Sequence, residues 1–438
     1  MTGTLNPETI STRLQRVAET SRKSPDMVWT TLAHHIDLDL LKEAYKLVRK
    51  DGAVGVDGQT AQNYAANLEE NLENLLNRFK SGSYKAPPVR RASIPKGDGK
   101  KTRMIGIPTF EDKILQRAVT MVLEAVYEQD FLDCSYGFRP RRSPHQALDA
   151  FWRKGMWMGG GYVLKLDIKQ YFDAVDHKQL RSILDKRVRD GVIRKTINKW
   201  LKAGILHEDR GNTGTPQGGV ISPLLANIYL HEVLDTWFEH EVRPRLEGDA
   251  FLIRYGDDAT LVFSSKAEAE RVGQALAKRV RAYGLELHPE KTRLIRFTRP
   301  GPNSGKNDRF HPETFDLLGF THYWGKSRKK NWVIKRKTAK DRFTRSVKDI
   351  SRWCRRNRHM EISEQHDNLV RKIKGHYQHF GITGNFKSLE RYIYEVRLTW
   401  RKWLNRRSQK GQMPWDRYQE LLKRYPLPEP KIVKPMVT

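Results

Sequence analysis

Cysteine and long apolar runs are both scarce in this chain. Its 438 residues include only two cysteines, Cys134 and Cys354, and no Cys-x-x-Cys pair. The sequence therefore predicts neither a structural zinc site built on cysteine pairs nor a disulfide framework, and it indicates a reducing compartment. No stretch approaches the length of a membrane-spanning helix, and Met1 to Thr30 has no apolar core of a signal peptide. We expect a cytoplasmic protein with no membrane partner.

Acidic residues are strongly outnumbered. The chain has 51 Asp and Glu against 81 Lys and Arg, a formal net charge of +30. So large an excess repels itself unless a polyanion neutralises it, and nucleic acid does so with release of condensed counterions. The charge could instead serve solubility or an anionic membrane surface. Interleaving of Arg and Lys with Trp and Tyr through the C-terminal third favours nucleic acid.

Apolar spacing predicts a mixed order of helices and strands. Helical periodicity is found at residues 37–50, 62–79, 111–128, 223–241 and 265–283. Strand-like alternation indicates a basic hairpin at 86–108, a single strand at 162–166 and a second hairpin at 251–263. This order is typical of an α+β domain with helices behind an antiparallel sheet. Beyond about residue 336 the pattern becomes helical and basic, and we place a domain boundary near residues 325–330.

Three aspartates lie where predicted strands end. Asp167 follows the strand at 162–166, and Asp257 and Asp258 form the link of the second hairpin. If these strands are neighbours, the carboxylates converge at one edge of the sheet. Carboxylate oxygens suit Mg²⁺, and two such ions can clamp an in-line phosphoryl transfer. An isolated Asp-Asp is more often a turn former, but here specific motifs flank all three residues.

The motifs form an ordered series along the chain. They lie at residues 55–58, 93–96, 105–108, 135–140, 167–173, 214–227, 255–258, 287–292 and 315–320. With this series the chain resembles bacterial group II intron-encoded reverse transcriptases, the reverse transcriptase/maturase proteins, from about Leu40 to Val433.

The resemblance implies a right-hand polymerase followed by an all-α basic region. The expected parts are an N-terminal helical extension (1–60), fingers and palm (61–325), and a thumb and maturase RNA-binding region (336–438). The implied activity is RNA-directed DNA synthesis from dNTPs with two Mg²⁺ ions, or Mn²⁺ as the alternative. The implied partners are intron RNA, an RNA template with a DNA or RNA primer, and target DNA. We expect no zinc and no endonuclease domain in the chain.

The resemblance also assigns the metal site and one contact to the sugar. Asp167 and Asp257 would bind metal, with Asp258 adjacent and less often a direct ligand, and the backbone carbonyl of Ile168 could face a metal. Phe172, five residues after Asp167, would be a steric gate that excludes a ribose hydroxyl. The alternative for Phe172 is a core ring.

Four further residues are expected near the incoming nucleotide. Lys96 and Arg103 would fold over its triphosphate. Lys291 would lie near the pyrophosphate as a possible general acid, and Gln217 would pack near the nascent base pair. For Lys96 and Arg103 the alternative is a solvated basic face.

Contacts to nucleic acid are expected in two regions. Arg139 and Arg142 would touch template phosphates, unless they form an ordinary exposed basic loop. In the C-terminal part, the turn Leu318-Gly319 would support the primer end, and basic residues would contact RNA phosphates while the neighbouring tryptophans mostly pack a core. These basic residues include Arg401, Arg406 and Arg407.

One departure from the family pattern keeps other functions open. Family members more often have Tyr-Ala-Asp-Asp where this chain has Gly256. Gly-Asp-Asp also resembles viral RNA-dependent RNA polymerases, but Phe172 argues against an enzyme that accommodates a ribose hydroxyl. The remaining alternatives are a mobile-intron enzyme, a domesticated reverse transcriptase in host defence or repair, and an RNA-binding splicing factor with a vestigial site. The intact aspartates argue against the last of these.

Overall fold

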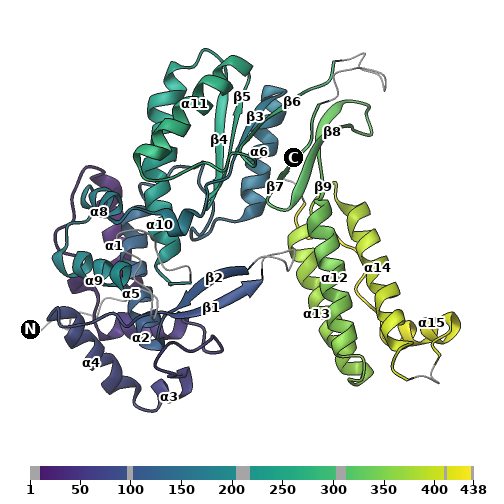
Figure 1. Ribbon diagram of the computed structural model, residues 1–438, viewed down its shortest axis with the longest axis horizontal. Helices are drawn as coiled ribbons and strands as arrows, with labels where there is room; N and C mark the ends of the chain where they lie inside the picture. Colours follow the sequence, from purple (N-terminus) through teal and green to yellow (C-terminus); the bar gives the residue numbers. More distant parts are fainter. Residues whose placement is uncertain (1–9, 96–101, 204–217, 302–311, 409–411, 436–438) are drawn as a thin grey trace, which may run out of the picture. The chain divides into compact units, whose positions relative to one another are not determined.

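The computed structural model describes residues 10–95, 102–203, 218–301, 312–408 and 412–435 of the chain. The chain divides into two compact units, one made of residues 1–143 and 163–294 and the other of residues 144–162 and 295–438. Both contain helices and strands (Figure 1). The expected α+β class is therefore confirmed at this level.

Helices build the N-terminal part of the first unit. They are α1 (Ile10–Lys23), α2 (Leu38–Leu47), α3 (Ala61–Ala65), α4 (Leu68–Lys80) and α5 (Phe110–Tyr127). Helix α5 is central, since most of its residues are buried and α1 and α2 both pack against it. The single helix expected at 62–79 is wrong, because the backbone of Asn67 is not helical and separates α3 from α4.

A two-stranded hairpin precedes α5, as expected. Strand β1 (Arg90–Pro95) pairs antiparallel with β2 (Thr102–Ile107), and Arg90 lies opposite Ile107. Thr109 then caps α5, because its hydroxyl accepts a hydrogen bond from the backbone N–H of Asp112 at 3.2 Å.

A four-stranded sheet carries the predicted aspartates. Its order is β4 (Ala250–Tyr255), β5 (Asp258–Phe263), β3 (Gly160–Leu166) and β6 (Arg293–Thr298). Strands β4 and β5 are antiparallel, with Tyr255 opposite Asp258, which confirms the second predicted hairpin. Helix α11 (Lys266–Ala282) packs on β5. Ser265 caps its start, and Gly284, in left-handed conformation (φ +73°), follows its end.

The remaining helices of the first unit lie between β3 and β4 in the chain. They are α7 (Tyr171–Ala174), α8 (His177–Asp185), α9 (Gly191–Lys202) and α10 (Ser222–Leu230). The helix expected at 223–241 is confirmed, but two π-helical segments, His231–Asp235 and Trp237–Val242, continue α10. Apolar spacing gave no sign of this change, which brings Asp235 into a buried position.

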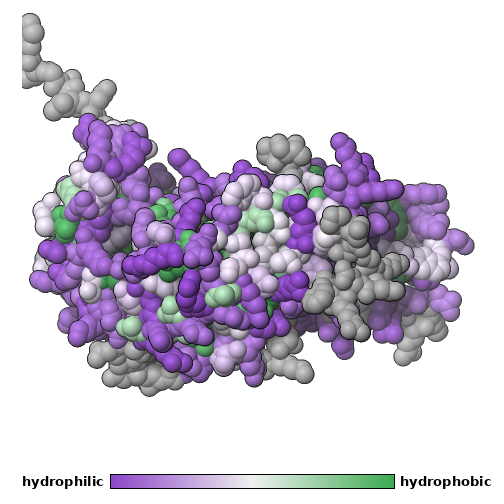
Figure 2. Space-filling model, turned by 90° about the horizontal axis from the view of Figure 1, so that it is seen from above, coloured by the Kyte–Doolittle hydropathy of each residue, from purple (hydrophilic) through white to green (hydrophobic). Residues whose placement is uncertain are grey.

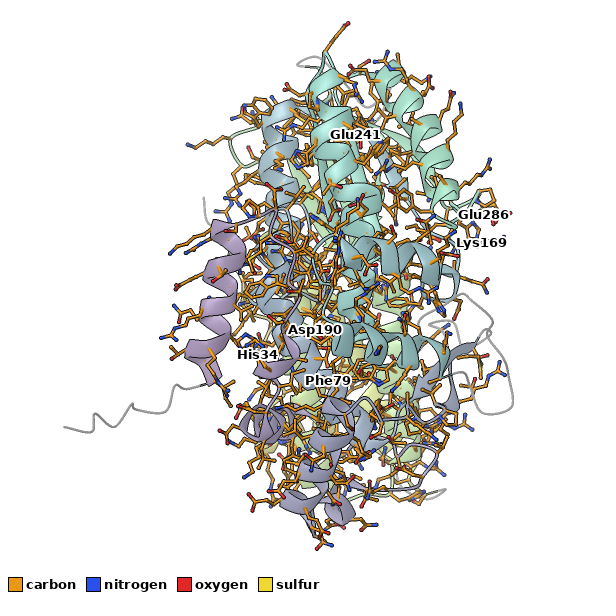
Figure 3. All side chains as sticks on the ribbon, turned by 90° about the vertical axis from the view of Figure 1, so that its left-hand side faces the viewer. His34, Phe79, Lys169, Asp190, Glu241 and Glu286 are labelled. Atoms are coloured by element: carbon orange, nitrogen blue, oxygen red, sulfur yellow. The ribbon has the colours of Figure 1, made fainter. Side chains whose placement is uncertain are left out.

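A buried aspartate joins α9 to the N-terminal segment. Asp190 is 4% exposed. Its carboxylate caps α9 at Val192 and Ile193, and its second oxygen accepts from the backbone N–H groups of Leu32 and Ala33 at 2.6 and 2.9 Å. Asp190 and His34 lie close together in Figure 3. One carboxylate therefore satisfies backbone donors from two distant segments.

The second unit combines one helix, a three-stranded sheet and a helical region. Helix α6 (Pro144–Met158) packs against β9, and the antiparallel strands are β7 (Phe315–Leu317), β8 (Phe320–Lys326) and β9 (Trp332–Thr338). The helices that follow are α12 (Lys340–Arg356), α13 (Ile362–Phe380), α14 (Phe386–Leu404) and α15 (Trp415–Arg424). The helical pattern expected beyond residue 336 is confirmed. Residues 325–330, near which we expect a domain boundary, lie at the end of β8 and in the turn to β9, and that boundary stays a prediction.

The face of the molecule drawn in Figure 2 is mostly hydrophilic. Within the described residues, no helix has the length and apolar character needed to cross a bilayer. One tryptophan of the second unit packs in its core. Trp400 on α14 is fully buried, and its indole N–H donates to the Gln365 side chain of α13 at 3.0 Å.

Candidate active site

The turn between β4 and β5 consists of Gly256 and Asp257. Gly256 has a left-handed backbone (φ +65°), which residues with a side chain adopt reluctantly. A Cβ on Gly256 would also lie 2.9 Å from Cε2 of Phe138, inside van der Waals contact. Backbone conformation and the Phe138 ring together account for glycine at position 256.

Asp167 lies directly after β3, which neighbours β5 in the sheet. Residues 286–288 support this end of β3, because His288 N–H donates to the Asp167 carbonyl at 2.7 Å and Lys169 N–H donates to the Glu286 carbonyl at 2.8 Å. These two bonds flank Ile168 and do not use its own carbonyl. Figure 3 shows the side chains of Lys169 and Glu286 close together, and their charged atoms are 3.2 Å apart.

Electrostatics links the Asp257 turn to the motif that begins at Asp167. Tyr171 is buried, and its hydroxyl donates to the Ala226 carbonyl at 2.6 Å. Burial raises the pKa of Tyr171 well above its ordinary value, and the negative charge of Asp257 adds to this rise. The expected neighbourhood of the strands is confirmed by the sheet itself, in which β5 lies between β4 and β3. Among the described residues, however, no three His, Cys, Asp or Glu side chains are grouped closely enough to hold a metal ion.

Lys291 is the cation beside Asp167. Its Nζ lies 3.4 Å from both carboxylate oxygens of Asp167, and the two side chains are 59% and 32% exposed. An exposed pair of this kind contributes little to stability. A positive charge at this carboxylate is therefore compatible with the local structure, and the lysine can be displaced at small energetic cost.

A buried polar network lies behind the turn. Arg254 and Asp235 are both fully buried, and two hydrogen bonds of 2.7 and 2.6 Å join the guanidinium to the carboxylate. A third nitrogen of Arg254 donates to the Asn227 side chain at 2.8 Å and to the Gly256 carbonyl at 3.0 Å. Burial acts to raise the pKa of Asp235, but the charge of Arg254 and the hydrogen bonds from His231 and Arg254 together outweigh it and hold that pKa below its ordinary value.

Sequence reasoning missed this network. The available signal was Arg254 itself, a charged residue directly after the apolar run Phe251-Leu252-Ile253 and within the predicted strand. A buried arginine needs a partner, and the partner is supplied by the π-helical segment that ends at Asp235.

Phe172 lies in the short helix α7 and is 9% exposed. Its ring packs edge-on against Tyr171, with 5.4 Å between ring centroids. This burial suits a core ring, and its role as a steric gate stays a prediction. Lys96 and Gln217 lie outside the described residues, as does the side chain of Arg103.

The two arginines expected on template phosphates have different surroundings. Arg139 is buried, forms an ion pair with Glu128 at 3.0 Å, and donates to the carbonyls of Leu132 and Ser135. This differs from the expected exposed contact, because the guanidinium stabilises its own loop. Arg142 is partly exposed and forms an ion pair with Asp133 at 2.6 Å.

The residues expected on nucleic acid in the second unit also have protein contacts. Leu318 and Gly319 form the β7–β8 turn, with φ of 50° and 88°. The guanidinium of Arg401 stacks 3.9 Å from the centre of the Trp415 ring, and that of Arg406 lies 5.4 Å from the Trp403 ring. Arg407 donates to the Met360 carbonyl at 2.8 Å. These arginines therefore contribute to packing of the helical region.

A second basic site lies on α8 and α9 in the first unit. It is a concavity of about 500 Å³ lined by Lys178, Arg181, Ser182, Asp185, Lys186, Arg189 and Arg194. Asp185 pairs with Arg194 at 2.6 Å, and Lys186 pairs with Glu232 at 2.6 Å. Five basic residues against one acidic residue in the lining make the concavity attractive to phosphate groups.

Comparison with known proteins identifies the family. The family model of the reverse transcriptases (RNA-dependent DNA polymerases) matches residues 94–322, just over half of the chain. The chain belongs to the reverse transcriptase family. The matched segment contains all three aspartates, the β4–β5 turn and the buried network behind it.

Named relatives confirm the resemblance to group II intron-encoded proteins. Group II intron-encoded protein LtrA of Lactococcus lactis subsp. cremoris is 40% identical over 227 residues, covering 50% of this chain and 37% of LtrA. Protein YkfC of Escherichia coli is 34% identical over 280 residues, covering 55% of this chain and 71% of YkfC. Nuclear intron maturase 2, mitochondrial, of Arabidopsis thaliana is 27% identical over 287 residues. The match thus spans little more than a third of LtrA.

Proposed function

We propose that this protein is an RNA-directed DNA polymerase of the group II intron type, which copies RNA into DNA from dNTPs. The observation that carries the proposal is that the hairpin with the Asp257 turn lies beside β3, the strand that directly precedes Asp167, within the segment that matches the reverse transcriptase family. The proposed active-site aspartates are Asp167, Asp257 and Asp258.

The proposed metal ligands are the carboxylates of Asp167 and Asp257, with Asp258 beside them and the Ile168 carbonyl as a further oxygen. The chemistry of this donor set fits Mg²⁺, since all its members are hard oxygen ligands. When bound, two such ions would lower the pKa of the primer hydroxyl and neutralise charge on the triphosphate. The exposed ion pair of Lys291 with Asp167 supports this assignment, because it marks a carboxylate that accepts a cation.

The protein's own side chains would orient the substrates. Phe172 is proposed to exclude a ribose hydroxyl, and Lys291 to hold a proton for the leaving pyrophosphate. Lys96 and Arg103 are proposed to bind the triphosphate, and Gln217 to contact the nascent base pair. The hairpin β1–β2 brings residues 90–95 and 102–107 together and so supports a joint action of its basic arms.

The wider proposal is binding of intron RNA to help it splice and to return it to a DNA target. We assign residues 1–60 to an N-terminal extension, 61–325 to fingers and palm, and 336–438 to a thumb and maturase region. The net charge of +30 and the basic helices α12 to α14 support contact with nucleic acid over large surfaces. The names of the related intron-encoded proteins and maturases support the same assignment.

Primer extension on a poly-rA template tests the polymerase proposal. We expect the purified protein to extend an oligo-dT primer with dTTP and not with UTP, and Asp257→Ala to abolish extension. Asp26→Asn serves as the control, because it alters an exposed aspartate in the turn after α1, outside the motifs and the sheet. A folded protein that binds RNA tightly but extends no primer would contradict the polymerase proposal and favour a splicing factor with a vestigial site.

A further inference from the structure

Phe138 is an exposed aromatic residue with an unfavourable backbone conformation. Its side chain is among the large apolar groups left open, at 54% exposure, and its φ of 59° lies in the left-handed region. Residues with a Cβ adopt this region at a cost, and such residues concentrate at functional sites. Burial of the ring does not offset the cost here, since more than half of the residue is exposed.

The fold holds this residue against the turn that carries Asp257. Residues 134–136 run parallel to β4, because Arg254 N–H donates to the Cys134 carbonyl at 2.7 Å and Tyr136 N–H donates to the Arg254 carbonyl at 2.8 Å. The next residue, Gly137, touches the turn directly, since a Cβ there would lie 2.2 Å from the backbone nitrogen of Gly256. Only glycine permits so close an approach of two backbones.

The buried network fixes both sides of this contact. Asn227 donates to the Gly137 carbonyl at 2.7 Å, and Arg254 donates both to Asn227 and to the Gly256 carbonyl. The two glycine peptides are therefore held by one set of buried, mutually bonded side chains. The position of the Phe138 ring relative to the turn is determined by the same set.

The ring itself covers Gly256, the residue before Asp257. A Cβ on Gly256 would meet Cε2 of Phe138 at 2.9 Å, and the centroids of the Phe138 and Tyr255 rings are 6.4 Å apart. An exposed aromatic face thus lies within one residue of a proposed metal ligand. Aromatic faces pack against nucleotides with little preference for base identity, which suits an enzyme that copies any sequence.

We propose that the Phe138 ring packs against the sugar and base of the 3′-terminal primer nucleotide and so positions its hydroxyl at Asp257. The ring binds and orients this nucleotide and takes no part in proton transfer. The proposal rests on the polymerase function, because it assigns the ring to the primer end at the polymerase turn. The test also distinguishes two alternatives, in which the ring contacts the incoming dNTP or contacts no nucleotide.

The test compares three variants of the full-length protein on a poly-rA template with an oligo-dT primer. Phe138→Ala removes the ring. Phe138→Leu keeps an apolar contact with the turn but has no aromatic face, and Phe138→Tyr keeps an aromatic face. The affinity for primer–template, the KM for dTTP and kcat are measured separately. Leu47→Ala, at a similarly exposed apolar residue of the first unit (52%), is the control for loss of surface apolar area.

We expect Phe138→Ala to lower kcat and to weaken primer–template binding. The ratio of kcat to the dissociation constant for primer–template should fall by about 5- to 160-fold, the range of one base-stacking contact. Phe138→Leu should show most of this fall in the ratio. Phe138→Tyr and Leu47→Ala should each change the ratio little. With a primer whose terminal nucleotide is abasic, most of the difference between wild type and Phe138→Ala should disappear.

Two results would overturn the proposal. A rise confined to the KM for dTTP would place the ring on the incoming nucleotide. An effect equal with normal and abasic primers, accompanied by a lower Tm, would give Phe138 only a packing role. Primer–template binding is measured without dNTP, so a protein that never extends a primer would contradict the polymerase function while still reporting on the ring.

Discussion

Replacement of Arg254 by methionine tests the buried network most sharply. The change leaves the Asp235 carboxylate without its two hydrogen bonds from the guanidinium, in a position that is fully buried. It also removes the donor to Asn227 and to the Gly256 carbonyl. Breaking one side of a buried ion pair costs about 3–5 kcal/mol, because an uncompensated charge stays behind. We expect a loss of this size in the free energy of unfolding.

The double variant Arg254→Met with Asp235→Leu separates stability from position. Replacing both members of a buried pair with apolar residues is often close to neutral in stability. We therefore expect the double variant to regain much of the lost free energy of unfolding. Primer extension should stay reduced, because the Gly256 carbonyl still lacks its donor and the Asp257 turn is less well held.

Urea denaturation and primer extension on the same preparations provide the assay. Arg243→Met is the matched control, since Arg243 forms an ion pair with Glu239 at 2.6 Å but is 57% exposed. Exposed pairs are worth about 0–1 kcal/mol. A loss below about 1 kcal/mol in Arg254→Met would refute the reasoning about burial. Full activity in the double variant would refute the role of the network in holding the turn.

Three further predictions concern other parts of the first unit. Gly256→Ala should destabilise the protein by about 1–2 kcal/mol because of the left-handed backbone alone. The new Cβ would also press on the Phe138 ring, and Phe138→Ala should relieve part of that contact. A double-mutant cycle by urea denaturation measures this coupling. Burial raises the pKa of Asp112 to about 7. Between about pH 4 and pH 7 the folded chain keeps a proton on Asp112 that the unfolded chain has lost, so the free energy of unfolding should fall as the pH rises through this range. Denaturation at several pH values should show that Asp112→Asn removes this slope. Arg181 and Arg189 line the basic concavity. Replacing both with Gln should make the plot of log binding constant against log salt concentration for single-stranded RNA less steep by up to about 1.4, or about 0.7 for each lost phosphate contact. An unchanged slope would show that RNA phosphates do not bind in the concavity.

The polymerase strands were predictable because their patterns are local. Apolar runs on both sides of Asp257 and the turn-forming Gly256 specify the β4–β5 hairpin within fourteen residues, Ala250 to Phe263. The cap at Ser265 and the stop at Gly284 are equally local signals for α11. For such elements the sequence pattern and the structure agree.

Features that depend on distant contacts were not predictable. The break between α3 and α4 at Asn67 interrupts a pattern that reads as one helix. The π-helical turns after α10 have no mark in the apolar spacing, yet they place Asp235 against Arg254. The burial of Arg139 depends on Glu128 and on two carbonyls of its own loop. In each case tertiary pairing decides where a polar residue lies.

The carboxylates at the end of β3 and in the β4–β5 turn are proposed to catalyse RNA-directed DNA synthesis. The most direct measurement is incorporation of radiolabelled dTTP on a poly-rA template by the wild type and by Asp167→Ala, with RNA affinity and Tm measured on both proteins. We predict robust incorporation by the wild type and at least a hundredfold less by the variant (about 2.7 kcal/mol of transition-state stabilisation), at unchanged RNA affinity. Equal incorporation by the two folded proteins would contradict the claim.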